Sequence, residues 1–544
     1  MDACRWWRHA LVGVLVVAIA TLLLPGVVAG VDTVGHQSTD GADPVGTEPL
    51  ANASGPTEVI VRFEPIEDVE RYHEDDVVDE LVDHADVEQA AFETFADDHD
   101  AVSVESEFWL ANAMLVTVDA DEVDAADLLA VSNVTRVHEN VEIETFAVDG
   151  DTPTGDDTSR MSTDGQHQTS ADAAAYTPGL ELIDVPAAWD RFETRGAGAT
   201  VAVIDTGVDP THQDVDLHGW AEFDENGTLV SDDLGDARDP NGHGTHVAGT
   251  VAGGSTSGTH IGVAPDARMY GINTFDADGT ATFASVLAGM EHATATEEVD
   301  VLQMSLGANG TIGGFIGPVH NARATDRIVI AASGNTGHET SSSPANVYDA
   351  LAVGAVQGDR TIATFSSGET INKTAAYANP PAEWPDHYVV PDATAPGVGV
   401  TSAEAGTRDG YVELQGTSMA APHVSGIAAL TVAATDGRIG GDDLQSAIVD
   451  TAVHPDGAAA PDDRYGHGVV DAEAAVETGI DAAPPPTPTP TPTPAPTPTP
   501  TPDVIEPAVN DDATGFGSLV AIVAVVVAVV ALAAASDAGH RRRE

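Results

Sequence analysis

The chain has 544 residues, more than one ordinary domain, so several segments are expected. Acidic residues outnumber basic ones by 88 to 20, the formal net charge is −68, and Lys373 is the only lysine. A chain without a basic patch cannot neutralise phosphates, which excludes nucleic acid as a partner. Such acidity suits a salt-rich medium that screens self-repulsion, whereas the 42% hydrophobic content argues against disorder of the whole chain.

The first thirty residues have the pattern of a secretory signal peptide. Arg5 and Arg8 precede an apolar run over 11–28, and small residues follow it. An uncleaved membrane anchor is the alternative. The only cysteine, Cys4, lies in this segment, so the rest of the chain is expected to have neither disulfides nor thiol chemistry. Residues 31–56 are rich in Gly, Thr, Asp and Pro and are expected to form a flexible lead.

The next segment, 57–147, is predicted to be a small α+β domain. Its elements follow the order β-α-β-β-α-β, which is typical of a ferredoxin-like fold. Strands are expected at 58–63, 102–108, 113–118 and 134–143. Helices are expected between the first two strands, up to about residue 98, and at 122–131. Residues 148–176 have little to bury and are expected to be a linker and a natural place for processing.

From residue 177 to about 480, apolar strands alternate with helical runs. This alternation indicates a mostly parallel sheet with helices on both faces and with sites at the carboxyl ends of the strands. Strands are expected at 200–204, 267–273, 299–305, 328–333 and 350–356, and helices at 243–252, 283–296, 314–325 and 418–434.

Three motifs in this segment carry residues suited to nucleophilic catalysis. An apolar strand ends in Asp205, His243 begins a small-residue helix, and Ser418 begins another. A serine hydroxyl is a weak nucleophile that needs a base and an orienting carboxylate, and at a helix start its own N–H points where an oxyanion would form. Each residue alone also has an ordinary explanation, since serine is a common helix N-cap and aspartate a common turn residue.

The motifs Val201-Ala202-Val203-Ile204-Asp205, Gly242-His243-Gly244-Thr245-His246 and Gly416-Thr417-Ser418-Met419-Ala420 occur in the order Asp…His…Ser. This order resembles that of the subtilisin-like serine proteases, the subtilase family, and the composition resembles the halolysin-type secreted proteases of haloarchaea. The resemblance covers about 180–477. It implies a subtilisin-like three-layer α/β fold and peptide-bond hydrolysis through an acyl-enzyme, with Ser418 as nucleophile, His243 as base and Asp205 orienting the imidazole.

The resemblance also assigns the oxyanion donor and the substrate strands. Asn335 is expected to donate its side-chain amide to the oxyanion, although an Asn in a Gly-rich turn is otherwise an ordinary turn residue. Two strands are expected to flank the specificity pocket and to pair with an extended substrate, with a tendency towards bulky apolar side chains. Their residues are Ser305, Leu306, Gly307, Ala332, Ser333 and Gly334.

No cofactor is expected for the chemistry, but the resemblance implies a structural calcium site at Asp214. Thr256 stands where familiar members have asparagine, so either backbone carbonyls complete the site or Asp214 is one more solvated acid. No H-E-x-x-H motif or cysteine pair suggests zinc. Packing or surface roles are expected for His212, His246, His423 and His467.

Two low-complexity stretches follow. A Pro-Pro-Pro and Thr-Pro run up to Pro502 predicts an extended polyproline-II stalk. An uncharged run over 514–535, at about 1.5 Å per residue, spans roughly 30 Å, and Arg541 to Arg543 follow it. Either this run stays as a transmembrane helix, or the tail is a sorting signal that is replaced by a lipid. Its Thr514-Gly515-Phe516 resembles the Pro-Gly-Phe of haloarchaeal surface proteins.

Segment 57–147 resembles the propeptide domain of subtilases, which assists folding and inhibits the enzyme by laying its tail across the cleft. An unrelated α+β domain is the alternative. The sequence therefore predicts a salt-adapted, self-processing endopeptidase, secreted and anchored on the outer face of the cell envelope. The rivals are a catalytically dead peptide-binding or surface-layer module and a narrow processing enzyme for exported proteins. The predicted segments are signal peptide 1–30, lead 31–56, propeptide 57–147, linker 148–176, catalytic domain 177–480, stalk 481–513 and C-terminal segment 514–544.

Overall fold

The computed structural model describes residues 48–146, apart from 67, and residues 175–485, apart from 277, 278, 456, 458 and 459. The predicted signal peptide, the Thr-Pro stalk and the apolar run over 514–535 lie outside the described residues, as does nearly all of the predicted linker. None of the helices in the described ranges has the length and apolar character that a membrane span requires.

The first described segment contains a four-stranded antiparallel sheet with the strand order β2-β3-β1-β4. The predicted β-α-β-β-α-β order is present. Alternating residues of β1 explain the packing: Val59 and Val61 face the domain's own core, whereas Ile60 faces the opposite side. The elements are α1 Glu48–Ala51, β1 Pro56–Phe63, η1 Val69–Arg71, α2 Glu74–Asp97, β2 Val102–Phe108, β3 Ala113–Asp119, α3 Ala125–Leu129 and β4 Val134–Glu139.

Two elements of this segment differ from the prediction. Helix α3 is five residues long instead of ten, because Asp124 caps its start with a capping box and Ala130 ends it. The strand expected over 134–143 divides at Asn140 and Val141 into β4 and a separate strand, β5 (Glu142–Thr145). Strand β5 leaves the four-stranded sheet and pairs elsewhere.

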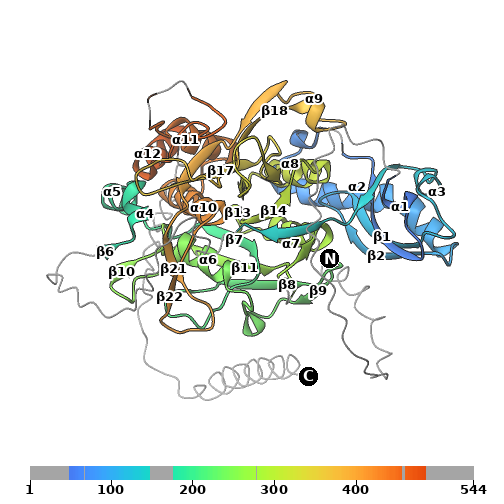
Figure 1. Ribbon diagram of the computed structural model, residues 1–544, viewed down its shortest axis with the longest axis horizontal. Coiled ribbons are helices and arrows are strands. Elements are labelled where there is room, and N and C mark those ends of the chain that lie inside the picture. Colours follow the sequence, from blue (N-terminus) through green and yellow to red (C-terminus); the bar gives the residue numbers. More distant parts are fainter. Residues whose placement is uncertain are drawn as a thin grey trace, which may run out of the picture. The chain divides into compact units, whose positions relative to one another are not determined.

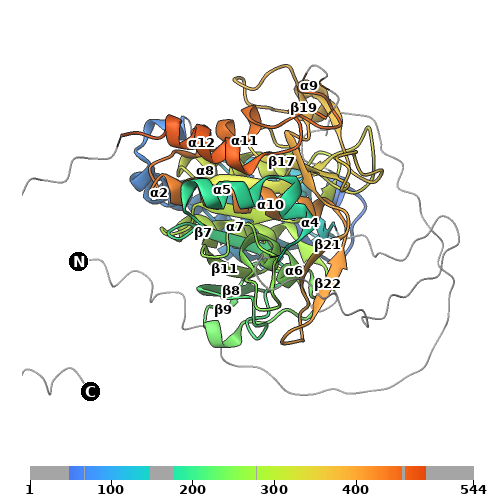
Figure 2. The ribbon, with the colours of Figure 1, turned by 90° about the vertical axis from the view of Figure 1, so that its left-hand side faces the viewer.

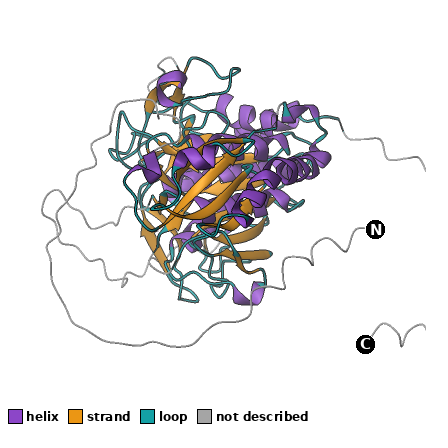
Figure 3. Ribbon diagram, turned by 90° about the vertical axis from the view of Figure 1, so that its right-hand side faces the viewer, coloured by secondary structure: helices purple, strands orange, loops and turns teal. Residues whose placement is uncertain are grey.

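The second segment is built on an eight-stranded sheet with the order β20-β17-β15-β13-β7-β11-β8-β9 (Figure 3). Every neighbouring pair is parallel except the edge pair of β8 and β9. The mostly parallel sheet predicted from the alternating pattern is confirmed. The strands are β7 Thr200–Asp205, β8 Gly219–Phe223, β9 Leu229–Ser231, β11 Arg268–Asn273, β13 Val301–Met304, β15 Ile328–Ala332, β17 Leu351–Val356 and β20 Ala393–Pro396.

Helices cover both faces of this sheet, which gives three layers (Figures 1 and 2). Val201 and Val203 of β7 belong to the core formed with α5, α6, α10, α11 and α12, whereas Ala202 and Ile204 belong to the core formed with α7 and α8. The bounds are α4 Pro178–Leu182, α5 Val185–Phe192, α6 His243–Ala252, α7 Phe283–Ala295, α8 Ile316–Ala324, α10 Thr417–Ala434, α11 Gly441–Asp450 and α12 Ala472–Ala482.

Shorter elements complete the segment and were mostly not predicted, because two to four residues carry little periodic signal. One small sheet, β12-β5-β14-β16, includes the strand that leaves the first segment. The remaining elements are β6 Ala175–Tyr176, η2 Leu234–Asp236, β10 Thr259–His260, β12 Ala281–Thr282, β14 Leu306–Asn309, η3 Gly313–Phe315, β16 Ser342–Ser343, β18 Glu369–Asn372, α9 Lys373–Ala376, β19 His387–Val390, β21 Val400–Ala403 and β22 Tyr411–Leu414.

The two segments share one apolar core. Ile60 and Leu115, on the outer face of the four-stranded sheet, lie in the same buried cluster as Phe283 of α7 and Val319 of α8. Burial of apolar side chains across this face stabilises the contact without requiring opposite charges.

The only lysine has a structural role. Lys373 is 8% exposed, and its Nζ donates to the backbone carbonyls of Pro381, Ala382 and Trp384 at 3.3, 3.1 and 2.5 Å. Three donors on one ammonium group match three carbonyls of the loop before β19.

We expect Lys373→Met to lower the free energy of unfolding by about 1–3 kcal/mol, because the thioether keeps the chain length but leaves loop carbonyls unpaired. Arg268→Met is the matched control, since Arg268 forms only an exposed pair with Glu298 at 3.6 Å, and pairs of this kind contribute about 0–1 kcal/mol. Chemical denaturation of the two variants measures both values. Equal losses in the two variants would contradict the role of Lys373.

Candidate active site

Asp205 and His243 come together at the carboxyl end of β7. Asp205 is the last residue of that strand and is fully buried, and His243 is the first residue of α6. The Nδ1 of His243 lies 2.7 Å from the Oδ1 of Asp205, which also accepts the Thr206 N–H. The Nε2 of His243 is buried and has no hydrogen-bond partner among the described residues, so this atom is available for a proton.

Ser418 is the second residue of α10 and is fully buried. Its hydroxyl donates to the Ser305 carbonyl at 3.0 Å, and the Ser305 hydroxyl donates to the Ser418 carbonyl at 2.8 Å. The hydroxyl is therefore not bonded to His243 in this structure. These two reciprocal hydrogen bonds hold Ser418, the predicted nucleophile, against Ser305, the residue that follows β13.

Asn335 lies in the turn after β15, and its amide is oriented by the start of α10. Its Oδ1 accepts the backbone N–H and the hydroxyl of Thr417, each at 3.0 Å. Its Nδ2 donates to the carbonyl oxygen of Phe146. Gly416 has φ 151°, and a Cβ there would collide with the same carbonyl oxygen, so only glycine permits this approach.

The strand that carries Phe146 lies between two strands of the second segment. Strand β5 pairs antiparallel with β14 through Thr145–Leu306 and Glu144–Gly307, and with β12 through Ile143–Ala281. Leu306 and Gly307, two of the residues predicted to line the substrate cleft, thus pair with β5. Ser305 accepts the Phe146 N–H at 3.4 Å, which extends the same ladder.

Two apolar side chains, one from β5 and one from the residue that follows it, are buried against the second segment. Ile143 is fully buried and Phe146 is 7% exposed. A Cβ at Gly307 would lie 2.9 Å from the Phe146 ring, so the missing side chain leaves room for the aromatic residue. Ala332 shares the apolar core with Phe146, while Ser333 and Gly334 bond to Ser367 and Thr417 behind it.

Asp239, which the sequence analysis did not single out, shapes the start of α6. Its two carboxylate oxygens accept the N–H groups of Gly242 and Thr245, at 2.7 and 2.8 Å, and the hydroxyl of Thr206. Burial first, and then the nearby Asp205 carboxylate, raise the pKa of Asp239. This acid fixes the turn that presents His243.

Asp214, the predicted calcium ligand, is held by two protein donors. The Oδ1 of Asp214 accepts the Thr256 N–H at 2.7 Å, and its Oδ2 accepts the Tyr411 hydroxyl at 2.5 Å. Both oxygens are therefore engaged by protein donors. Within the described ranges, no group of three or more acidic, histidine or cysteine side chains is arranged to hold a metal ion.

The histidines that were assigned packing roles are buried or hydrogen-bonded to backbone. His246 donates from Nε2 to the Val400 carbonyl at 2.9 Å, and His423 donates from Nδ1 to the Met419 carbonyl at 2.8 Å. Burial lowers the pKa of His246 to about 3 and that of His423 to about 4. Both are neutral near pH 7. His212 bonds the Gly410 carbonyl, and His467 lines a separate cavity.

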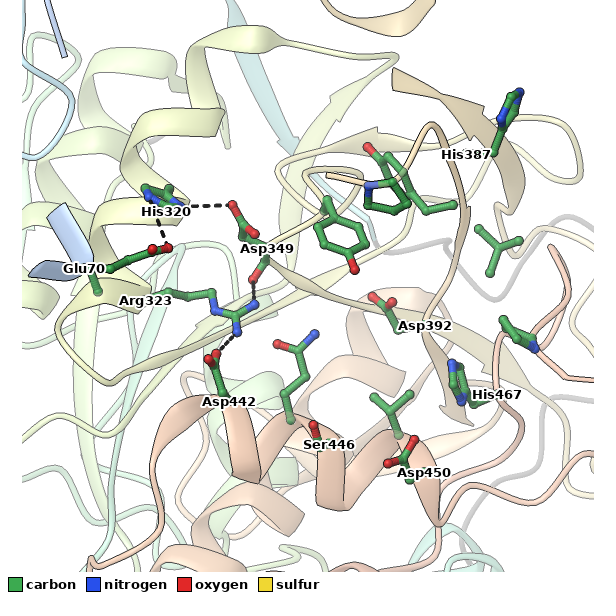
Figure 4. A pocket seen from close by; sticks show the side chains of 18 residues that line it. Glu70, His320, Arg323, Asp349, His387, Asp392, Asp442, Ser446, Asp450 and His467 are labelled. Carbon is green, nitrogen blue, oxygen red and sulfur yellow. Dashed lines mark hydrogen bonds and ion pairs between the residues drawn. The ribbon is translucent and has the colours of Figure 1, made fainter. Parts of the chain in front are cut away.

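That cavity, of about 880 Å³, contains none of the predicted catalytic residues (Figure 4). His320 lies between Glu70 and Asp349, with nitrogen–oxygen distances of 3.8 and 3.3 Å, and the Asp349 hydrogen bond raises the pKa of His320. Arg323 bonds the Asp349 carbonyl and the Asp442 carboxylate. His320, Arg323, Asp349 and Asp442 are thus joined in one polar network, and we assign the cavity no chemistry.

Sequence reasoning missed Phe146, Ile143 and Asn140, because their contacts are made by strands far away in the chain. One signal was present: apolar residues alternate with glutamates over 141–144, from Val141 to Ile143, and Phe146 follows closely. That continuation could have extended the predicted strand to the edge of the linker.

Comparisons with known proteins agree with this geometry. The family model described as the subtilase family matches residues 196–468. Subtilisin BL of Lederbergia lenta is 35% identical over 297 residues, which cover 55% of this chain and 97% of the relative. Alkaline elastase YaB of Bacillus sp. (strain YaB) is 30% identical over 404 residues, 74% of this chain and 89% of the relative. A thermostable alkaline protease of Halalkalibacterium halodurans is 32% identical over 58% of this chain and 80% of the relative.

His246 gives a pH-dependent prediction. The pKa of its imidazole is about 6.5 in the unfolded chain and about 3 in the folded one. The neutral imidazole therefore contributes fully to the free energy of unfolding above pH 6.5, and this contribution is lost as the pH falls below that value. Between pH 7.5 and 5, wild type should lose about 2 kcal/mol of unfolding free energy relative to His246→Gln. Denaturant titrations at both pH values measure the difference, and a constant difference would contradict the neutral, buried imidazole.

Proposed function

The chain belongs to the subtilase family and is a serine endopeptidase, and we propose that it is a secreted, surface-attached member that processes its own precursor and is adapted to high salt. The observation that carries the mechanism is the position of the Phe146 carbonyl oxygen at the Asn335 amide. A peptide held in this way presents its carbonyl group to the N-terminal end of α10, where Ser418 lies.

The proposed triad works as follows. The Ser418 hydroxyl attacks the peptide carbonyl carbon, and His243 takes the hydroxyl proton at Nε2 and returns it to the leaving amine. Asp205 accepts the Nδ1–H and stabilises the imidazolium. Water then attacks the acyl-enzyme with the same help. Because the Ser418 hydroxyl donates to the Ser305 carbonyl in this structure, it must first turn to Nε2.

The oxyanion is the second part of the mechanism. The Asn335 Nδ2 donates to the oxygen that becomes negative, and Thr417 holds that amide in place through two hydrogen bonds to its Oδ1. A donor fixed before the reaction needs no reorganisation as charge develops, and removing such a donor typically costs about 10²–10³ in kcat.

The segment up to Phe146 is proposed to be the propeptide, both inhibitor and first substrate. Its sheet packs on α7 and α8, and its last strand fills the cleft between β12 and β14. The alignment with the YaB relative supports the assignment, since it covers 74% of this chain and so reaches beyond the catalytic segment. The carbonyl that lies at Asn335 belongs to the Phe146–Ala147 bond, which we propose as the site of self-cleavage.

Secretion and surface attachment rest on the sequence. The signal-like segment 1–30, the Thr-Pro stalk and the apolar run over 514–535 support export followed by retention through the C-terminus. Either a retained helix or a replaced lipid would hold the catalytic segment outside the cell. A structural calcium ion at Asp214 stays a prediction.

Salt adaptation rests on charge. Residues 48–146 contain 28 acids and three arginines, and residues 175–485 contain 44 acids against ten arginines and one lysine. The acids within each segment, and those of the two segments, repel one another in dilute buffer. This repulsion reaches about 10 Å at 0.1 M salt, which is the Debye length there, but only about 3 Å at 1 M.

Cleavage assays distinguish the proposed function from the two alternative functions. An inactive peptide-binding module would hold β5 in the cleft and never cut it, whereas a narrow processing enzyme would cut its own tail but leave unrelated proteins such as casein intact. The proposal is that unrelated proteins with a bulky apolar residue before the cut are also cleaved.

Intact-mass analysis tests the nucleophile and the cleavage site together. In high salt, wild type should separate into a fragment that ends at Phe146 and a chain that begins at Ala147, whereas Ser418→Ala should remain one chain because it lacks the attacking oxygen. Ser446→Ala, which replaces an exposed serine of α11, is the control and should process normally. Processing of Ser418→Ala at the wild-type rate would refute the triad, and a different wild-type cut would refute the bond assignment.

Salt dependence is the second test. Proteolytic activity and the melting temperature should both rise steeply from 0.1 M to 3 M NaCl, because screening relieves repulsion among the acids. Sucrose at matched osmotic pressure is the control, since it favours compaction but screens no charge. Equal activity and melting temperature at both salt concentrations would remove the salt adaptation.

A further inference from the structure

We propose that Gln303 and Ser425 are positioning residues of the nucleophile, because buried hydrogen bonds carry their effect to Ser418 through the Ser305 hydroxyl. The inference deepens the proposed function and rests on it, since it takes Ser418 as the attacking residue. The Gln303 network consists of Ser425, Gln303, Ser305 and Ser418, and all four residues are fully buried. The proposed triad includes Ser418, and a substrate-binding role was predicted for Ser305, but Gln303 and Ser425 have so far been given no role.

The spacing of the four residues brings them face to face. Val301 of β13 belongs to the apolar core that α10 fills, so Gln303 and Ser305, two and four residues further on, also face α10. Ser418 and Ser425 are seven residues apart, which is about two helical turns, and lie on one face of α10. Seven helical residues span about 10 Å but two strand residues only about 7 Å, and the long Gln303 side chain spans the difference.

Hydrogen bonds join the network in one direction. The Ser425 hydroxyl donates to the Oε1 of Gln303, and the Nε2 of Gln303 donates to the Oγ of Ser305 at 2.7 Å. The Ser305 hydroxyl then donates to the Ser418 carbonyl at 2.8 Å. Because Ser425 binds the oxygen of the amide, the nitrogen faces Ser305, and the Ser305 proton is available for Ser418. A buried polar network whose members are bonded in this way is rigid.

The Ser418 carbonyl needs a donor from outside its helix. In an α-helix this carbonyl would accept the N–H of the residue four positions further on, which is Pro422 and has no N–H. The Ser305 hydroxyl supplies a donor in its place. The backbone of the nucleophile is therefore held by the sheet at the point where the hydrogen bonding of α10 is interrupted.

This backbone position matters for the rate. Thr417, next to Ser418, holds the Asn335 amide through two hydrogen bonds, so a shift of the helix start would displace the nucleophile and the oxyanion donor together. Displacements of reacting groups are costly to the rate. The main-chain pairing with β12 and β14 would stay, because it does not involve α10. Loss of the network should therefore lower kcat and leave KM nearly unchanged.

Peptide hydrolysis by the processed enzyme in high salt tests the network, with active sites counted by a labelled fluorophosphonate. The substrate copies residues 140–149 of the chain. Gln303→Met keeps an unbranched side chain but removes the donor and the acceptor of the amide. Its kcat per active site should fall about threefold to tenfold, the size expected for one hydrogen bond, with KM unchanged.

Two further variants complete this comparison. Ser425→Ala removes the hydroxyl that orients the amide, and its kcat should also fall. It is the milder change and keeps the test decisive if Gln303→Met does not fold. Thr431→Val is the matched control, because it removes another buried hydroxyl of α10, one that donates to the Ile427 carbonyl of the same helix. Its kcat should equal that of wild type.

A double variant shows whether Gln303 acts through Ser305. Ser305→Ala removes the hydroxyl that reaches Ser418 and should lower kcat by itself. In that background Gln303→Met should cause no further loss of kcat, since the contact that it supports is already gone. Independent losses that multiply in the double variant would overturn the role of Ser305 as the intermediary.

Gln303→Glu tests the direction of the hydrogen bonds. A neutral carboxyl group can donate to Ser305 and accept from Ser425, as the amide does, whereas a carboxylate can only accept. Burial raises the pKa of a carboxyl group and so favours the neutral form. The kcat of Gln303→Glu, divided by that of Gln303→Met at the same pH, should exceed one at the acid end of the activity range. The division cancels the titration of His243.

The outcomes separate this inference from the proposed function. Unchanged kcat per active site in both Gln303→Met and Ser425→Ala would overturn the positioning role, and so would a Glu-to-Met ratio of one at every pH. A merely structural role would lower the free energy of unfolding and the number of active sites, but not kcat per site. A wild type that neither hydrolyses the peptide nor reacts with the fluorophosphonate at Ser418 would instead refute the proposed function.

Discussion

The pairing of β5 on both of its edges determines how the other parts of the site act. A strand held by β12 on one side and β14 on the other cannot shift register without losing hydrogen bonds on both. That fixed register brings the Phe146 carbonyl to Asn335 and places Ile143 in a buried position. Pairing through main-chain groups accepts many sequences, so in the proposed protease selectivity would come from the few side chains that are buried beside the strand.

The contact between the two segments follows a second constraint, because both are strongly acidic. Two of its buried ionisable side chains bond to backbone groups. Arg62 donates to the Gly314 carbonyl, and Glu291 accepts the Leu110 N–H at 3.0 Å. Burial lowers the pKa of Arg62 to about 10 and raises that of Glu291 to about 8. Buried hydrogen bonds of this kind are screened little by salt, so they suit an interface that forms in brine.

The sequence predicted the residues whose role is encoded locally. Asp205, His243 and Ser418 each stand at a strand end or a helix start that can be recognised from neighbouring residues, and the structure brings the first two within hydrogen-bond distance. It could not predict where β5 goes, because its partners Ala281 and Leu306 lie more than 130 residues further along the chain. Nor could it predict the partners of Asp214, since Tyr411, which donates to its carboxylate, is 197 residues away.

The position of the Ser418 hydroxyl shows how one geometry can serve both an inhibitor and a substrate. With β5 in the cleft, the carbonyl carbon and the oxyanion donor are in place, but the hydroxyl donates to Ser305 and His243 Nε2 has no partner among the described residues. Rotation of one side chain is then the step between a bound strand and an attacked one. A tail that binds tightly through both edges lowers the free energy of the complex without lowering that of the transition state, and so inhibits. After cleavage the same tail keeps its strand pairing, so release of the product, and not the chemistry, is expected to limit the appearance of active enzyme.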